Sequence, residues 1–315
     1  MTTVLERQAL ATRSPFHPGD EAAYRGWRDR KLSQRPRSAA DLIVDVADPR
    51  ALTAGELAAL QDRCARFNMA VYRSAQQAAD PALPRRLGQQ LGLHRLDANW
   101  LADDDGISRI AVGGGSDGAE GGGLIPYTDR AIRWHTDGYY QPSARRIRAM
   151  ILHCVQPAAA GGDNALIDHE LAYIALRDAS PRWVQSLMAP DAMTIPAREG
   201  AGGVVRPAQT GPVFSVDPVD GSLHMRYTAR TRSIEWKDDP ATRKAVAWLA
   251  QWMDGDAGLS LRLGPGMGIV ANNVLHARSA FSDDPAAPRL LYRARYLDRV
   301  DAAAGLAGEA TWRDG

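Results

Sequence analysis

Residues 268–296 of this 315-residue chain read GIVANNVLHARSAFSDDPAAPRLLYRARY, and this stretch decides the fold class. An apolar run that ends at His276 is followed by a polar turn and by a second apolar run. Short apolar runs bounded by turn residues indicate β-strands. In the second strand Arg289, Arg293 and Arg295 share one face. If that face points into a barrel, the guanidinium groups need an anionic partner, which a buried or bound carboxylate would supply.

Other parts of the chain indicate more strands and a few helices. Capping-box spacing of Thr53 and Glu56 predicts a helix that begins there. An N-cap candidate followed by proline predicts two later helices, 181–188 and 240–253. Further runs predict a helix at 81–91 and strands at 69–72, 107–112 and 149–155. We therefore predict a mainly β fold with flanking helices.

Composition and charge limit the function classes. The 38 basic and 37 acidic residues nearly cancel, so the balance of charge gives no reason to expect nucleic acid or an anionic membrane as a partner. The two cysteines form neither a disulfide framework nor a zinc pattern. Neither a signal peptide nor a membrane-spanning run stands out. We expect a cytoplasmic protein, with weak order up to residue 20 and from 301 to 315.

A second stretch, RWHTDGYYQ at 133–141, carries candidate chemistry. In an extended chain His135 and Asp137 point to the same side, either as two metal ligands or as a surface hydrogen-bonded pair. Together with the distant His276 they give two histidines and one carboxylate, which is the facial triad of non-haem Fe(II) oxygenases. By contrast, the glycine-rich loop at 113–123 matches a dinucleotide fingerprint only formally, since no helix follows it. That loop is either a lid or a plain surface loop.

These motifs together resemble the taurine/2,4-dichlorophenoxyacetate dioxygenase family of Fe(II)- and 2-oxoglutarate-dependent oxygenases. The resemblance rests on WHTDGYY, on HARSAF after the distal strand, and on Arg289, 13 positions (289 − 276) beyond His276. QPAAAGGDNALID at 156–168 and LTAGELAAL at 52–60 extend it over most of the chain. It implies one domain, 21–300, with a double-stranded β-helix or jelly-roll fold and an insertion with a lid at about 159–267.

The resemblance also implies roles for single residues. His135, Asp137 and His276 would hold Fe(II), and Arg289 would pair with the distal carboxylate of 2-oxoglutarate. Asn164 stands where the family usually has a threonine that hydrogen-bonds this co-substrate. Arg293 would lie near the co-substrate or an anionic substrate. With O2, such a site oxidises an unactivated C–H bond and releases succinate and CO2, and the retained carboxylate of Asp137 favours hydroxylation over halogenation.

Three further residues are candidates for lining the substrate: Tyr139, Tyr140 and His153. At least one of the two tyrosines could instead pack in the core. For His153, packing in the core is the favoured interpretation. The expected partner is a small molecule, anionic or similar to an amino acid, and the protein could form a dimer or tetramer. Two other functions stay open: a cupin-like metalloenzyme that does not use 2-oxoglutarate, and a jelly-roll binding protein without catalysis.

Overall fold

The structure is a computed structural model that describes residues 14–97, 106–114, 124–200, 203–230, 234–255 and 257–300. It divides into two compact units. The first, which we call the jelly-roll unit, is drawn from residues 36–133, 145–166 and 259–315, and the second, the helical unit, from 1–35, 134–144 and 167–258. Most of the expected insertion joins two other segments in the helical unit, and the single domain stays a prediction.

The larger sheet of the jelly-roll unit has six strands. Strands β1 and β2 are parallel, and the remaining neighbours are antiparallel. In spatial order the strands are β1 (Ile43–Asp45), β2 (Met69–Arg73), β16 (Met267–Ala271), β5 (Ala149–Gln156), β19 (Leu290–Tyr296) and β3 (Ser108–Ile110).

A four-stranded sheet forms the second layer. Its order is β15 (Leu259–Leu261), β7 (Asn164–Ile167), β17 (Leu275–Arg278) and β4 (Ile132–His135). One hydrophobic cluster joins Leu166 and Val274 to Leu152, Ile269 and Leu291 of the six-stranded sheet. Two sheets packed over one apolar core are the double-stranded β-helix predicted from the sequence.

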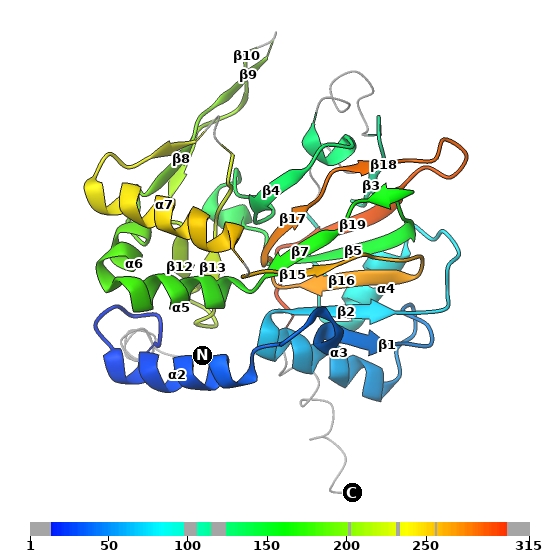
Figure 1. Ribbon diagram of the computed structural model, residues 1–315, viewed down its shortest axis with the longest axis horizontal. Coiled ribbons are helices and arrows are strands. Elements are labelled where there is room, and N and C mark those ends of the chain that lie inside the picture. Colours follow the sequence, from blue (N-terminus) through cyan, green and yellow to red (C-terminus); the bar gives the residue numbers. More distant parts are fainter. Residues whose placement is uncertain are drawn as a thin grey trace, which may run out of the picture. The chain divides into compact units, whose positions relative to one another are not determined.

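Two helices pack on the outer face of the six-stranded sheet, α3 (Ala54–Phe67) and α4 (Leu83–Gln90) (Figure 1). A second cluster there contains Leu60 and Leu87 from the helices, with Tyr292 from β19. The predicted capping box is present, since the Thr53 side chain accepts from the Glu56 backbone amide and the Glu56 carboxylate accepts from the Thr53 amide. Shorter elements of this unit are the 3-10 helices Ala39–Leu42 and Ile125–Tyr127 and the strands β6 (Ala160–Gly161) and β18 (Phe281–Ser282).

The run expected as one strand ending at His276 is two strands in two sheets. Asn273 adopts a left-handed backbone conformation with φ 51° and turns the chain from β16 into β17. Its side chain donates to the Ile147 carbonyl at 2.7 Å, which holds the turn. Apolar residues lie on both sides of this turn, so hydrophobic periodicity does not reveal it. The asparagine was the available signal, because asparagine adopts the left-handed conformation more readily than most residues.

The helical unit contains α2 (Glu21–Gln34), α5 (His169–Ala179), α6 (Pro181–Leu187) and α7 (Pro240–Asp254). The last two start after Ser180 and Asp239, as predicted. Helices α6 and α7 meet through Trp183 and Trp248, whose ring centroids are 6.0 Å apart. Short strands complete the unit: β8 (Met193–Ile195), β9 (Arg198–Gly200), β10 (Gly203–Arg206), β11 (Gln209–Gly211), β12 (Phe214–Val216), β13 (Leu223–Met225) and β14 (Glu235–Trp236). The 3-10 helix Ser143–Arg145 lies at the chain boundary between the two units.

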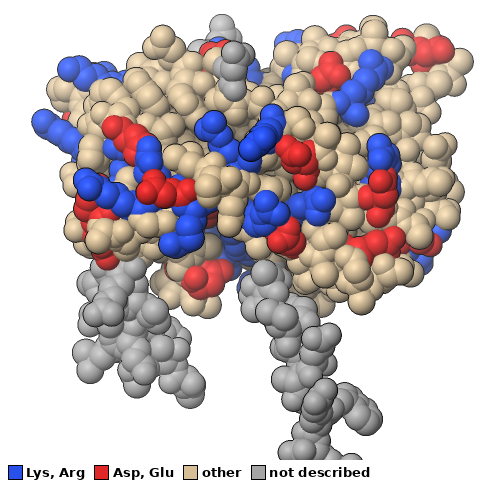
Figure 2. Space-filling view, turned by 60° about the horizontal axis from the view of Figure 1, so that its bottom comes forward, with Lys and Arg blue, Asp and Glu red and all other residues tan. Residues whose placement is uncertain are grey.

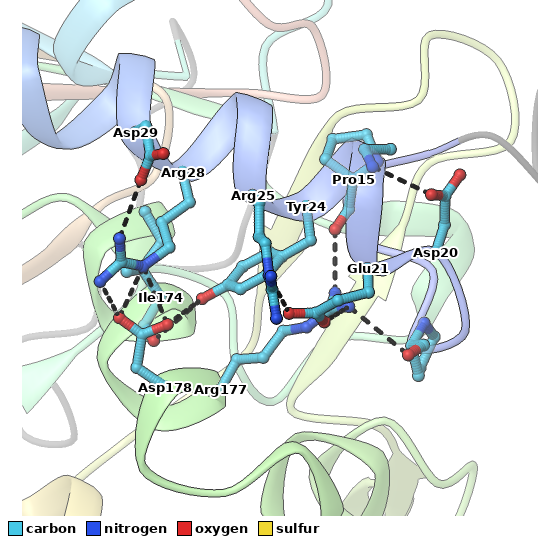
Figure 3. Close-up of polar contacts among 12 residues, drawn as sticks. Pro15, Asp20, Glu21, Tyr24, Arg25, Arg28, Asp29, Ile174, Arg177 and Asp178 are labelled. Carbon is cyan, nitrogen blue, oxygen red and sulfur yellow. Dashed lines mark hydrogen bonds and ion pairs between the residues drawn. The ribbon is translucent and has the colours of Figure 1, made fainter.

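Helices α2 and α5, which the sequence analysis did not predict, are joined by a polar network (Figure 3). The Tyr24 hydroxyl donates to Asp178 at 2.7 Å, and Arg28 pairs with the same carboxylate. The Tyr173 hydroxyl donates to the carbonyl of Phe16, a buried residue. Phe16, in the segment for which weak order was expected, therefore packs against α5; residues 1–13 and 301–315 lie outside the described part.

Surface charge follows the balanced composition. Figure 2 shows acidic and basic side chains interspersed on the face that it draws. Among the described residues, no helix is long and apolar enough to cross a membrane.

Candidate active site

The first two predicted ligands belong to a stretch held by a neighbouring segment of the helical unit. His135 ends β4, and Asp137 follows two positions later with 6% of its surface exposed. The Thr136 amide donates to the Tyr227 carbonyl at 3.0 Å, and the Ala229 amide donates to the Trp134 carbonyl at 2.7 Å. His135 is thereby bridged to Thr228. This pairing keeps residues 134–136 extended, which is the conformation that the predicted common side of His135 and Asp137 requires.

The third predicted ligand, His276, lies in β17 of the jelly-roll unit. Its Nδ1 atom is 3.0 Å from the Val274 carbonyl oxygen. A carbonyl can only accept, so this contact requires the proton on Nδ1 and makes Nε2 the nitrogen whose lone pair can bind a metal. Such a hydrogen bond on one ring nitrogen is the usual way of orienting a histidine whose other nitrogen binds a metal.

In the described part of the chain, one group of side chains could hold a metal ion: His135, Asp137 and His276, with one potential ligand atom from each within 4.8 Å of the others. Two imidazoles and one carboxylate suit Fe(II), and three protein ligands leave the remaining octahedral positions for substrate or co-substrate. The donor set therefore fits the iron that the sequence predicts.

Arg289, Asn164 and Gly162 line one pocket of the jelly-roll unit, together with Cys154 and Leu291. Arg289 is 4% exposed, and no carboxylate among the described residues forms an ion pair with its guanidinium. Burial lowers the pKa of Arg289, while nearby Cys154 and Asp283 raise it. A buried cation without an ion-paired carboxylate in the described part of the chain, next to a pocket, is suited to a bound carboxylate.

The glycines of the GGDN motif shape this pocket. Gly161 and Gly162 have φ values of 70° and 75°, a backbone region that favours glycine. A Cβ atom on Gly161 would come within 2.2 Å of the Ala280 carbonyl oxygen, so this strand needs glycine to approach β18. The motif thus places Asn164, which is 7% exposed, directly after a tight turn beside Arg289.

Arg278 supports this pocket and was not singled out from the sequence. It is buried, and its guanidinium donates to the backbone carbonyls of Pro126, Thr128 and Arg130. Its Cζ atom lies 4.7 Å from the centroid of the Phe281 ring, and that of Arg289 lies 5.0 Å from the same ring. Burial, and next the charge of Arg289, lower the pKa of Arg278 to about 10. The signal was present in HARSAF, where an arginine and a phenylalanine follow the distal histidine.

The other two arginines of β19 differ in their surroundings. Arg295 forms an ion pair of 2.7 Å with Asp97, and both side chains are buried. Asp97 also accepts from Arg145 at 2.8 Å. Arg293 is buried opposite Leu152 of β5. Arg295 therefore has the structural ion pair that the sequence analysis allowed for, whereas Arg289 borders the pocket.

His153 lies in the core. It is fully buried on β5, its Nδ1 atom is 2.8 Å from the Tyr72 hydroxyl, and its ring stacks on Tyr72 at 6.0 Å and on Tyr292 at 6.5 Å. Burial lowers the pKa of His153 to about 4. These contacts lie on the face of β5 opposite to Leu152 and Cys154, whose side chains belong to the inner cluster. His153 therefore packs as a core residue, which is the alternative that the sequence favoured over a place beside the substrate.

Tyr139 and Tyr140 are half-buried in the helical unit. Their rings meet edge to face with centroids 5.3 Å apart. The Arg206 guanidinium lies 5.9 Å from the centroid of Tyr140. Tyr140 thus has a charged neighbour in Arg206, and both tyrosine rings remain partly exposed. Residues 115–123 of the glycine-rich loop lie outside the described residues.

A jelly-roll fold with a His-Asp-His group defines the class of non-haem iron oxygenases. The chain matches the family described as taurine catabolism dioxygenase TauD, TfdA family, over residues 28–295, and it belongs to that family. A curated relative from Streptomyces sp, a uridine-5'-phosphate dioxygenase, is 30% identical over 203 residues, which cover 62% of this chain and 70% of the relative. The predicted family and enzyme class, a dioxygenase, are confirmed.

Solved structures agree on the fold. An asparagine oxygenase in complex with Fe(II), 3-hydroxyasparagine and succinate aligns with a TM-score of 0.56 and 14% identity, over 78% of each chain. A non-haem iron oxygenase, OrfP, in complex with Fe and L-Arg aligns with a TM-score of 0.54 and 17% identity, over 78% of this chain and 80% of the other. The predicted fold is thereby confirmed, and the iron and succinate in these neighbours agree with the predicted cofactors Fe(II), 2-oxoglutarate and O2.

Proposed function

We propose that the protein is an Fe(II)- and 2-oxoglutarate-dependent dioxygenase that oxidises an unactivated C–H bond of a small anionic substrate and releases succinate and CO2. His135, Asp137 and His276 hold the iron, and Arg289 with Asn164 binds 2-oxoglutarate. The observation that carries the proposal is the buried Arg289 guanidinium, which borders a pocket with Asn164 and has no carboxylate partner among the described residues. A metalloenzyme that does not use 2-oxoglutarate has no need of this group.

In this proposal some residues bind the co-substrate, and others orient the metal ligands. The planar Arg289 fork pairs with the distal carboxylate of 2-oxoglutarate through two parallel hydrogen bonds. The Asn164 amide donates one more, in place of the threonine hydroxyl usual in the family. The Val274 carbonyl orients His276 so that Nε2 is the metal ligand. When bound, the iron supplies the activation of O2 that these side chains cannot perform themselves.

Two residues affect the outcome at the substrate. Asp137 supplies a carboxylate as the third protein ligand, so no position is vacated for a halide, and we expect hydroxylation or a related oxidation. Arg293, buried on β19, provides a second cation for the co-substrate or for an anionic substrate. The relative's name points to a nucleotide and the solved neighbours to amino acids, so both substrate types enter the tests below.

The testing experiment is an anaerobic titration of the apo-protein with Fe(II) and 2-oxoglutarate, followed through the weak visible charge-transfer band. We expect the band in the native protein and in the His94→Ala control, its loss in His135→Ala, and a weaker 2-oxoglutarate affinity in Arg289→Ala. Iron binding without the band would overturn the proposal and favour a cupin-like enzyme. No specific iron binding would favour a jelly-roll binding protein.

Location and assembly are part of the same proposal. We expect a cytoplasmic enzyme that acts on a small molecule, without a nucleic-acid or membrane partner, as a dimer or tetramer. Size-exclusion chromatography with light scattering measures the mass of the assembly and tests the last point.

A further inference from the structure

The helical unit brings arginine side chains to the tyrosine pair that follows Asp137. In the β9–β10 hairpin, Arg206 is the direct cross-strand partner of Arg198. Like charges directly opposite each other destabilise a strand pair. The register therefore places a second positive charge next to Arg206.

Arg206 is held in position by backbone carbonyls. Its guanidinium donates to the backbone carbonyls of Pro196 at 2.6 Å and Pro207 at 3.1 Å. These neutral acceptors orient the group without cancelling its charge, and no carboxylate among the described residues forms an ion pair with it. Burial lowers the pKa of Arg206, and the Arg198 charge acts in the same direction.

Arg230 approaches the same tyrosines from another segment. It directly follows Ala229, whose amide is bonded to the Trp134 carbonyl beside His135. Tyr139 hydrogen-bonds to the Thr228 side chain, two residues before Arg230, and the charge of Arg230 acts on the Tyr139 hydroxyl. Arg230 also forms no ion pair with a carboxylate among the described residues. Two guanidinium groups thus lie near the pair of aromatic rings, and the pair begins two residues after a proposed iron ligand.

We propose that Arg206 and Arg230, with Tyr139 and Tyr140, form the substrate subsite for a phosphomonoester attached to an aromatic base. Two arginine side chains that form no ion pair with a described carboxylate match a phosphate dianion, which guanidinium groups bind through paired hydrogen bonds. The tyrosine rings supply an aromatic surface for a planar base. This inference rests on the proposed function, because it places the substrate beside the metal-binding strand; it also agrees with the nucleotide in the relative's name.

The test is calorimetric titration of the Fe(II)- and 2-oxoglutarate-loaded protein, without O2, with uridine-5'-monophosphate, uridine and L-asparagine. We expect the nucleotide to bind and uridine to bind much more weakly. Arg206→Gln and Arg230→Gln should each weaken nucleotide binding about 10- to 100-fold. Arg206→Lys should recover part of the affinity, because it restores the charge without the planar fork. The control Arg182→Gln replaces an exposed arginine on α6 and should bind like the native protein.

The charge-transfer band separates the two proposals. If the band forms in Arg206→Gln and Arg230→Gln but nucleotide affinity is unchanged, the subsite is overturned and the proposed function stands. Equal binding of uridine and its monophosphate, or binding of L-asparagine alone, also overturns the subsite. If the band is absent in the native protein, the proposed function fails, and titration of the protein without iron still decides whether the arginines bind the phosphate.

Discussion

At the scale of single residues, the arginines of β19 show how the same side chain takes different roles. Arg289, Arg293 and Arg295 come from one strand and its edge, yet Arg295 is neutralised by the buried carboxylate of Asp97. Arg289 lies over the Phe281 ring and borders a pocket, and no carboxylate among the described residues forms an ion pair with it. A charge that protein groups leave uncompensated is the one available to a ligand.

Exchanging Arg289 for lysine tests the need for a planar fork. Arg289→Lys keeps the charge but makes at most one good hydrogen bond to the distal carboxylate. We expect the dissociation constant of 2-oxoglutarate to rise about 10-fold in Arg289→Lys and more in Arg289→Ala, measured through the charge-transfer band. Arg182→Lys is the matched control. Equal affinities in all four proteins would remove Arg289 from the co-substrate site.

His153 gives a pH prediction. Its pKa is about 4 in the folded protein, against about 6.5 in an unfolded chain, so between these values the unfolded state binds more protons. Its contribution to the free energy of unfolding is complete above pH 6.5 and is lost as the pH falls towards 4, by roughly 3 kcal/mol at most. Urea unfolding at pH 5 and pH 7 should show this loss in the native protein and a smaller one in His153→Gln. An identical pH dependence in both would contradict the assignment.

At the scale of elements, Asp178 of α5 holds α2 through Tyr24 and Arg28. Arg28 and Asp178 are each about a third exposed, so solvent weakens their ion pair, and the Tyr24 hydrogen bond contributes the larger part. We expect Asp178→Ala to lower the free energy of unfolding by about 1 to 2 kcal/mol and to speed proteolysis of α2. Asp29→Ala, which removes the more exposed partner of Arg28, should have little effect. Equal losses in the two variants would show that the network does not depend on Asp178.

The starts of three helices, α3, α6 and α7, were predicted accurately from the sequence. The capping box at Thr53 fixes the start of α3, and the Asp239 side chain, which accepts from the amides of Ala241 and Thr242, fixes the start of α7. Helix α5 also has a side-chain cap from Asp168, but it follows strand β7 almost directly, so its start was missed. Local signals identify a helix only where the preceding chain does not obscure them.

At the scale of the whole molecule, ligand binding should stabilise the fold, since the proposed ligands come from distant parts of the chain. Ligand that binds only the folded state adds about 2.7 kcal/mol at 100 times its dissociation constant. With Mn²⁺ as an O2-stable substitute and 2-oxoglutarate, we expect the melting temperature to rise by several degrees. The rise should disappear in Asp137→Ala and persist in His94→Ala. A rise that persists in Asp137→Ala would place the metal elsewhere.

The sequence by itself determined the class of protein, because the ligand types, their order and their spacing are local properties of the chain. It predicted the two-sheet fold and the residues His135, Asp137 and His276. The tertiary structure decided what depends on distant partners: that Arg295 is paired with Asp97, that His153 lies between Tyr72 and Tyr292, and that Asn273 turns the chain from one sheet to the other. Periodicity says which side chains share a face, but only the folded chain says which charges on that face are already neutralised.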